Sequence, residues 1–364
     1  MTLRPFHCLV YLVLGLLVPA TASAEVTLKK SMWGPAVVDG GSQFPIYAEL
    51  GVGIWQTAMR WDQVARRRPA SPTDPSDPAY VWPAELDAAI AEAGRQGIAV
   101  SLLVMGTPSW ANGGRPAAWA PSSPRDYPRF LTAAARRYPG ISHWMIWGEP
   151  TKGTNFQPLR TDHGRRLRGR GLRGPRIYAR MLDRAYGALK SASRANLVIG
   201  GNSFTVGTVS PRRWIQALRL PNGRPPRMDL YGHNPFSARR PVLSQPPLGR
   251  GYADFGDLDT LAGWLDRNLR GARPDRGRLK LFLSEISLPT DHDNFEFNFY
   301  VTRATQASWI ADALRETRRW RRIYAFGYLG LYDDALRPDG RQVERGLLER
   351  GGTPKPGYEA FRRG

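Results

Sequence analysis

The stretch Trp144-Met145-Ile146-Trp147-Gly148-Glu149-Pro150 decides the expected fold. A run of bulky apolar residues ends on a single carboxylate, and a proline follows at once. Such a run is typical of a strand in a parallel sheet that is covered on both faces, where polar side chains find no place. The stretch therefore predicts a buried parallel strand that presents one acid, Glu149, at its C-terminal end.

A second stretch downstream has the same design. Leu279-Lys280-Leu281-Phe282-Leu283-Ser284-Glu285-Ile286 again carries an apolar strand to a glutamate. Between and around the two stretches, short apolar runs alternate with segments of helical pattern. The expected strands cover residues 32–34, 54–61, 98–105, 141–147, 197–200, 228–231, 279–284 and 323–329, and the expected helices cover 44–50, 84–96, 125–138, 176–192, 211–218, 258–269, 302–320 and 358–363.

Eight alternating strand–helix units predict an α/β fold, a (β/α)8 TIM barrel that forms a single domain. A doubly wound open sheet is the alternative for such an alternation. It would be expected to carry a G-x-G-x-x-G turn or a phosphate-binding loop, and neither follows a predicted strand. In a barrel the two glutamates would both lie at the C-terminal face, where active sites are built.

The N-terminus has the features of a secretory signal peptide. Arg4 precedes an apolar run over residues 9–18, which is too short to span a bilayer, and Ala22-Ser23-Ala24 forms a small-residue cleavage site. We expect a signal peptide over 1–24 and an exported domain over 25–364, with an uncleaved anchor as the alternative. The single cysteine, Cys8, would leave with the signal, so the mature protein would have no disulfide. No later segment is apolar enough to span a membrane, which predicts a secreted or cell-envelope protein.

The composition is that of a globular chain with a large excess of positive charge. Among 364 residues, 42% are hydrophobic and 23% charged, and the formal net charge is +21. A loop read RTDHGRRLRGRGLRGPR, residues 160–176, concentrates arginine. The charge predicts an anionic polysaccharide as partner, or it reflects only a preference for arginine codons. No nucleic-acid recognition motif accompanies it, so nucleic acid is not the expected partner.

The two strand-tip glutamates resemble those of clan A glycoside hydrolases, over roughly residues 33–331. In that clan an Asn-Glu-Pro ends the fourth strand and its glutamate is the acid/base, which matches Glu149. A second glutamate ends the seventh strand and is the nucleophile, which matches Glu285. The resemblance implies a retaining mechanism, which needs the two carboxyl groups about 5–5.5 Å apart.

The resemblance also assigns roles to residues around the pair. It implies that Arg60 supports the nucleophile, that His233 ends strand six at the site and that Tyr328 provides an aromatic floor. One position departs from the family, because Gly148 stands where the clan has an asparagine that binds the sugar 2-hydroxyl. Asn202, at the tip of strand five, is our candidate to reach the same hydroxyl.

Electrostatics and stacking complete the expected site. Arg60 close to Glu285 would keep that carboxylate ionised, and burial among apolar neighbours would raise the pKa of Glu149. Trp33 and Trp110, near predicted loop ends, are expected to stack on sugar rings, although aromatic residues also fill cores.

The resulting hypothesis is an exported, monomeric, retaining glycoside hydrolase that acts on a polysaccharide or oligosaccharide. No metal or organic cofactor is expected, since the five histidines show no zinc-ligand spacing. The alternative is a non-catalytic glycan-binding barrel of the cell envelope that lost its activity with the asparagine at position 148. An esterase is a third option, but no G-x-S-x-G follows a predicted strand.

Overall fold

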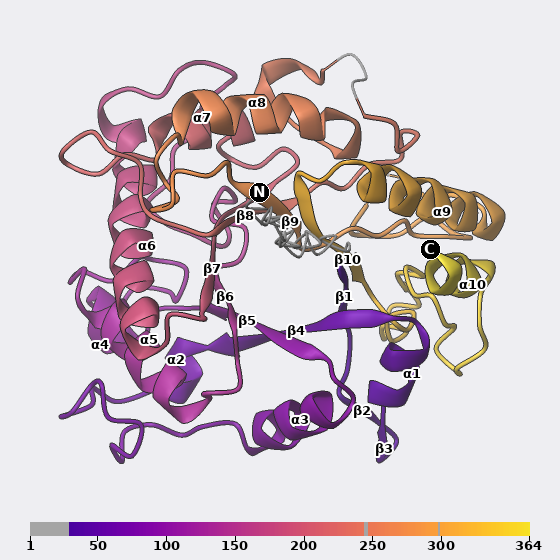
Figure 1. The fold of residues 1–364 in the computed structure, drawn as a ribbon, viewed down its shortest axis with the longest axis horizontal. Coiled ribbons are helices and arrows are strands. Elements are labelled where there is room, and N and C mark those ends of the chain that lie inside the picture. Colours follow the sequence, from indigo (N-terminus) through magenta and orange to yellow (C-terminus); the bar gives the residue numbers. More distant parts are fainter. Residues whose placement is uncertain (1–28, 244–246, 298) are drawn as a thin grey trace, which may run out of the picture.

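The computed structural model describes residues 29–243, 247–297 and 299–364, and the predicted signal peptide lies outside these ranges. Eight parallel strands close into a barrel in the order β1-β10-β9-β8-β7-β6-β5-β4 (Figure 1). These strands are β1 (Lys29–Trp33), β4 (Val52–Arg60), β5 (Ala99–Met105), β6 (His143–Ile146), β7 (Leu197–Phe204), β8 (Leu230–Asn234), β9 (Lys280–Leu283) and β10 (Ile323–Leu329). The predicted (β/α)8 barrel is confirmed.

Helices surround the strands on all sides (Figure 1). They are α1 (Phe44–Glu49), α2 (Trp61–Val64), α3 (Ala84–Arg95), α4 (Ser109–Asn112), α5 (Asp126–Arg137), α6 (Arg173–Ala192), α7 (Pro211–Ala217), α8 (Leu258–Asn268), α9 (Arg303–Arg319) and α10 (Pro356–Arg363), with 3-10 turns η1 (Gly169–Leu172), η2 (Gly249–Gly251) and η3 (Phe255–Asp257). A small hairpin of β2 (Val37–Val38) and β3 (Gly41–Ser42), which the sequence did not predict, follows β1. Among the described residues, no helix has the length and apolar character needed to cross a membrane.

The core has two layers because successive strand residues point to opposite faces. The barrel interior holds one small cluster of side chains, Ile54, Leu103, Met145, Ile199, Leu230, Phe282 and Ala325. A much larger cluster fills the space between the strands and the helices. The same alternation determines which residue at each strand end faces the mouth of the barrel.

Two strands run further toward the mouth than the sequence indicated. β7 continues to Phe204 and β8 to Asn234, beyond the expected ends at 200 and 231. The pairing of the two strands shifts register between Gly200 and Ser203, and Asn202 between them has a φ of 42°. An irregularity of this kind redirects side chains at a strand end. It brings the tip of β8 to the level of the two glutamates.

Candidate active site

Glu149 sits on an unusual turn directly after β6. Trp147 and Glu149 both have positive φ angles, 68° and 41°, which side-chain-bearing residues rarely adopt. The amide nitrogen of Asn202 holds this turn by donating to the Trp147 carbonyl oxygen at 2.9 Å. Backbone strain of this type is concentrated at functional sites, where the surrounding structure must enforce it. The turn directs the largely buried Glu149 side chain toward the end of β8.

Two nitrogen groups engage the Glu149 carboxylate. Nδ2 of Asn234 donates to Oε1 at 3.0 Å, and Nζ of Lys152 lies 2.9 Å from Oε2. The Lys152 ammonium also lies 4.5 Å from the centre of the Phe204 ring, at the end of β7. Glu149 is therefore an ion-paired, hydrogen-bonded carboxylate, and only 8% of the residue is exposed.

Glu285 follows β9 and is placed by a hydrogen-bonded network at the preceding residue. Nε2 of Gln56 donates to the Ser284 carbonyl oxygen at 2.8 Å, and the Ser284 hydroxyl donates to Gln56 Oε1 at 3.1 Å. The indole nitrogen of Trp33 donates to the same hydroxyl at 3.3 Å. These bonds link β1, β4 and the end of β9, and they fix the backbone directly before Glu285.

The pKa of Glu285 is raised from its usual 4.5 to about 8. Burial is the largest cause, and the negative charge of Glu149 is the second. The positive charges of Lys152 and Arg345 and a hydrogen bond from Asn234 act in the opposite direction. Asn234 donates to Glu149 and also acts on the pKa of Glu285, and the charge of Glu149 acts on Glu285 as well, so the two carboxyl groups lie near each other. The two predicted glutamates converge, and one amide lies between them.

The predicted distribution of charge between the two glutamates is wrong for this ligand-free structure. Glu285, expected to be held ionised, is the group whose raised pKa favours a proton near neutral pH. The guanidinium of Arg60 donates two hydrogen bonds of 2.9 Å to the carboxylate of Asp62. The positive charge of Arg60 is therefore paired with Asp62 and not with Glu285. The cations that act on Glu285 are Lys152 and Arg345 instead. A supporting role of Arg60 in the loaded site stays a prediction.

The structure places His233 and Tyr328 on the outer face of the barrel, against the sequence-based expectation. Both ring nitrogens of His233 are engaged, by the Ser203 hydroxyl at 2.8 Å and the Ala253 carbonyl oxygen at 3.0 Å, and burial lowers its pKa to about 4. Tyr328 is fully buried, packs on Phe361 of α10 and donates its hydroxyl to the Arg345 carbonyl oxygen. Neither side chain can contact a sugar in the mouth.

The remaining predicted residues divide between the site and its support. Trp33 lines the mouth, where it contacts Ser284. Trp110 packs edge-on against Trp61, donates to the Ala65 carbonyl oxygen at 2.7 Å and is covered by Arg68. Asn202 is fully buried beneath the Glu149 turn. Of the two tryptophans, only Trp33 is therefore placed to meet a ligand beside the glutamates.

Asn234, which lies beside both acids, is not among the site residues predicted from the sequence. Leu230 faces the barrel interior, and alternation along β8 turns Gly232 and Asn234 inward and His233 outward. Applied to the printed sequence, the same period would have favoured Asn234 over its neighbour. Lys152 is harder to recognise from the sequence, where it is only a cation three residues after the acid at the strand end.

A cavity of about 470 Å³ opens at the β1–β10 side of the mouth. Trp33, Tyr332, Asp334 and Arg345 are among its lining residues. Its volume is in the range of small-molecule sites. Within the described ranges, no group of histidine, cysteine and acidic side chains is arranged to hold a metal ion.

Replacing Lys152 by methionine is expected to move the pH dependence of the site to higher pH. Loss of this positive charge removes an interaction that lowers the pKa of Glu285. If ionised Glu285 is the active form, kcat/KM rises with pH through that pKa, and the rise should shift to higher pH in the variant. Lys152→Arg, which keeps the charge, is the control. Identical profiles for all three proteins would show that Lys152 has no electrostatic influence on the pair.

Comparison with known proteins supports the fold assignment. No protein-family model matches the sequence, and curated proteins give no match. Among solved structures, a family 39 glycoside hydrolase from Bacteroides cellulosilyticus WH2 aligns over 93% of this chain and 64% of its own length, with a TM-score of 0.67 and 16% identity. A monomeric beta-xylosidase from Caulobacter crescentus CB15 aligns over 93% of this chain and 68% of its own, with a TM-score of 0.58 and 14% identity. The chain has the barrel fold of these glycoside hydrolases.

A glucosidase from Croceicoccus marinus gives the same result, with a TM-score of 0.62 and 14% identity over 92% of this chain. The chain spans 66% of the length of that protein. The resemblance to clan A glycoside hydrolases is thus confirmed at the level of the fold. What the barrel does must be inferred from its own residues.

Proposed function

We propose that the protein is a glycoside hydrolase that cleaves a polysaccharide or oligosaccharide with retention of configuration. The observation that carries this proposal is the convergence of Glu149 and Glu285, from β6 and β9, on the single side chain of Asn234. Two carboxyl groups that face each other across a barrel mouth are the minimal equipment for this reaction. Export, inferred from the N-terminal segment, and a monomeric state belong to the same proposal.

In the proposed mechanism Glu285 attacks the anomeric carbon while Glu149 protonates the departing glycosidic oxygen. Glu149 then activates the water that releases the glycosyl–enzyme intermediate. The ligand-free structure holds Glu149 in an ion pair, and the raised pKa of Glu285 favours its protonated form. The proposed mechanism therefore requires that substrate entry part Glu149 from Lys152 and that the proton pass from Glu285 to Glu149 before the bond is cleaved. The charges of Lys152 and Arg345 assist, since both favour ionised Glu285.

A panel of activated fluorinated glycosides tests the proposal most directly. These compounds stall a retaining enzyme as a covalent intermediate, and peptide mapping then locates the labelled residue. We expect the label on Glu285, with a sugar preference that names the substrate. A label elsewhere, or reaction without a trapped intermediate, would contradict the proposed mechanism.

A non-catalytic glycan-binding barrel is the second candidate, and one observation favours it. Gly148 replaces the clan's asparagine, and a Cβ added there would lie 3.1 Å from Leu103 and 3.3 Å from Met105. The space for that side chain is thus partly filled. This candidate requires glycan binding without any trapped intermediate, so the fluorinated panel separates the two.

Asn234 is placed to supply the sugar contact that Gly148 cannot make. Its Nδ2 donates to Glu149, while its Oδ1 is buried without a hydrogen-bond partner among the described residues. A buried acceptor left unpaired is costly, and a sugar hydroxyl would satisfy it. Asn202, our earlier candidate for the sugar 2-hydroxyl, also has an Oδ1 without a partner among the described residues, but it does not bond either glutamate and lies beneath the Glu149 turn, where its amide nitrogen donates to the Trp147 carbonyl oxygen.

Asn234→Ala is expected to lower kcat/KM by about 10- to 100-fold, the effect of losing one hydrogen bond to a charged group. It should also abolish discrimination against a 2-deoxy substrate, since the contact with that hydroxyl is gone. Kinetics of both proteins on matched 2-hydroxy and 2-deoxy glycosides provide the measurement. Equal discrimination by the variant and the parent would show that Asn234 contacts no 2-hydroxyl. Ser237→Ala, in the loop after β8, serves as the control.

A further inference from the structure

A continuous run of exposed arginines begins at the mouth and continues along α6. Residues 160–184 contain nine arginines, all exposed, at positions 160, 165, 166, 168, 170, 173, 176, 180 and 184. The first five lie in the loop after β6 and in η1, and the last four lie on α6. Their spacing along α6 is three, four and four residues, which aligns them on one face of the helix. We call these nine side chains the arginine band.

Among the described residues the arginine band makes no ion pair, and of its nine side chains Arg184 acts electrostatically on a neighbouring acid, Asp183. The same stretch contains two acids, and both are engaged elsewhere. Asp162 accepts hydrogen bonds from the backbone nitrogen and hydroxyl of Ser210, and Asp183 pairs with Arg227. Within the described part of the chain, none of the nine arginines takes part in an ion pair or a side-chain hydrogen bond.

Several arginines elsewhere in this protein are compensated locally. Arg345, Arg239 and Arg303 each contact two carboxylates. A preference for arginine codons explains why the chain uses arginine, but it does not explain why nine in succession lack carboxylates. The concentration on one face is a property of the folded molecule.

The N-terminus of α6 strengthens the positive potential. Its first turn has no acidic residue and begins with Arg173, whereas α3, α5, α8 and α10 each carry an acid there. Positive side chains are unfavourable at this end of a helix, where the helix dipole is itself positive. Like charges at helical spacing also repel one another. Such an arrangement costs stability, and a bound anion would offset that cost.

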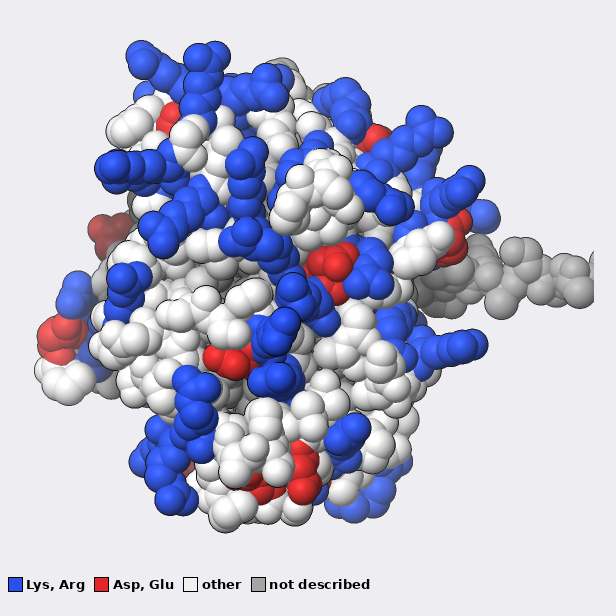
Figure 2. Space-filling model, turned by 90° about the vertical axis from the view of Figure 1, so that its left-hand side faces the viewer, with Lys and Arg blue, Asp and Glu red and all other residues white. Residues whose placement is uncertain are grey.

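The arginine band lies on a strongly basic face of the molecule (Figure 2). Figure 2 views the molecule from the side on which α6 lies in Figure 1, and it shows Lys and Arg side chains spread over this face with few acids among them. The segment that leads from Glu149 toward the band is tied to the loop after β7. Val209 donates its backbone N–H to the Thr151 carbonyl oxygen, and Gly153 donates to the Thr208 hydroxyl.

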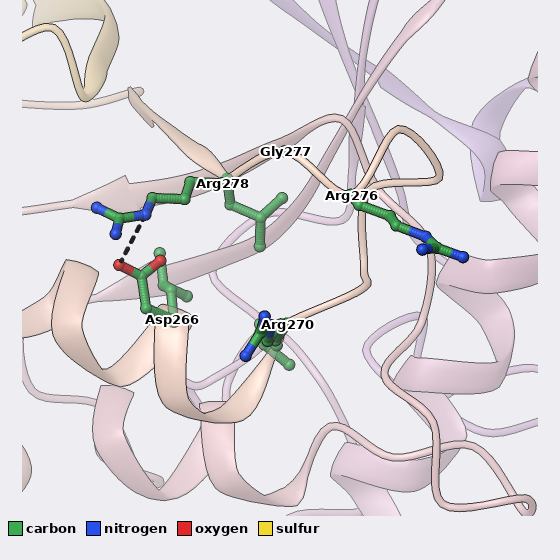
Figure 3. Close-up of a pocket in the computed structure, with 8 residues that line it drawn as sticks. Asp266, Arg270, Arg276, Gly277 and Arg278 are labelled. Atoms are coloured by element: carbon green, nitrogen blue, oxygen red, sulfur yellow. Dashed lines mark ion pairs between the residues drawn. The ribbon is translucent and has the colours of Figure 1, made fainter.

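A second group of arginines, at the opposite end of the barrel, differs from the band. It lines a cavity of about 320 Å³ just before β9. There Asp266 lies 3.9 Å from Arg278 and also pairs with Arg322, and the side chains of Arg276 and Arg278 point in opposite directions (Figure 3). These cations do not converge on a common ligand, so they offer a charge-matched control.

We propose that the arginine band binds an anionic polysaccharide, one that carries carboxylate or sulfate groups, and guides it to the mouth beside Glu149. The choice of a polysaccharide over other polyanions rests on the proposed function. The repeated charges of such a chain complement nine guanidinium groups, each of which can bind a carboxylate or sulfate through two hydrogen bonds. The exposed face of α6 places no aromatic side chain between the arginines, so it lacks the stacking surfaces typical of single-stranded nucleic-acid sites.

The test compares three variants that lose the same charge. One replaces Arg173, Arg176, Arg180 and Arg184 by glutamine, and a second does the same at Arg165, Arg166, Arg168 and Arg170. The control replaces Arg224, Arg270, Arg276 and Arg318, exposed arginines away from the band. Binding is measured without turnover, in a Glu285→Gln background, for polygalacturonate, neutral xylan and a short DNA duplex across a salt series.

Either band variant is expected to weaken polygalacturonate binding by about 10-fold or more, while the control changes it less than about 2-fold. Added salt should weaken binding by the parent protein more than binding by the band variants, since the exposed charges are screened. An equal loss of polygalacturonate affinity in all three variants would mean that only net charge matters, and it would overturn the proposal. Tighter binding of the DNA duplex than of polygalacturonate would also overturn it. If the band variants lose polygalacturonate binding but the fluorinated glycosides label no glutamate in the parent protein, the role of the arginine band is supported and the proposed hydrolase activity is contradicted.

Discussion

Glu285→Gln is expected to abolish turnover and, above about pH 8, to make the protein more stable than its parent. The loss of activity follows from the role proposed for the carboxylate, because an amide cannot form the glycosyl–enzyme bond. The rate on a confirmed substrate should fall by about 10⁴-fold or more, the scale of removing a catalytic nucleophile. The fold should be retained, since glutamine has the shape of the protonated side chain.

The gain in stability follows from the raised pKa. In the folded protein the pKa of Glu285 is about 8, against 4.5 when the group is exposed. Below pH 4.5 the group is protonated in both states and costs nothing. Between pH 4.5 and 8 the unfolded chain releases the proton while the folded chain retains it, so stability is lost as pH rises. Removing the titrating group should recover up to about 5 kcal/mol above pH 8 and nothing at pH 4.

Thermal or urea unfolding of both proteins at pH 4 and pH 8.5 provides the measurement. Glu316→Gln, on the exposed face of α9, is the matched control and should show no pH-dependent difference of this size. Near-native hydrolysis by Glu285→Gln would remove Glu285 from the mechanism. Equal stabilities at both pH values would show that its carboxyl group is not buried against Glu149.

Glu149→Ala is expected to separate substrates by their leaving groups. A poor leaving group needs protonation by Glu149, so its hydrolysis should fall by about 10²- to 10⁴-fold. An activated aryl group departs without that proton, so formation of the intermediate should be largely spared. Its breakdown still needs a base, so the intermediate should accumulate and azide, a small nucleophile that needs no base, should restore turnover as the glycosyl azide.

Product analysis and burst kinetics with and without azide measure these effects. Lys152→Met is the matched control, because it also breaks the ion pair at 2.9 Å but leaves the carboxyl group in place. Any loss of activity in the control, through its effect on the pKa of Glu285, should be the same for both substrate types and should show no azide rescue. Uniform loss on all substrates in Glu149→Ala, with no azide product, would contradict the acid/base assignment.

The linear sequence was sufficient for the barrel and for its two acids. The alternation of apolar runs with helical segments is a local pattern, and eight such units have few ways to bury both faces of every strand. The position of Glu149 and Glu285 at strand ends is local as well. A run of apolar residues that stops at a carboxylate marks the point where the strand leaves the core, and all strands of a parallel barrel leave it at the same face.

The tertiary structure alone decided which neighbours complete the site. His233 and Asn234 are adjacent, but the pleat turns one to the outer layer and the other between the acids. Tyr328 likewise faces α10, in register with Met32 of β1. Such outcomes depend on strand register, which a shift of one residue would reverse.

The electrostatics were equally beyond the sequence. Arg60 finds an acid two residues away, while the charge of Arg345, sixty positions after Glu285, reaches the site through the closed barrel. The pKa of Glu285 depends on burial and on Glu149, a partner far along the chain. The local sequence pattern therefore determined which residues could carry out the chemistry. Long-range packing determined which of them lie together, because burial and charge act between residues that are close in space and not in sequence.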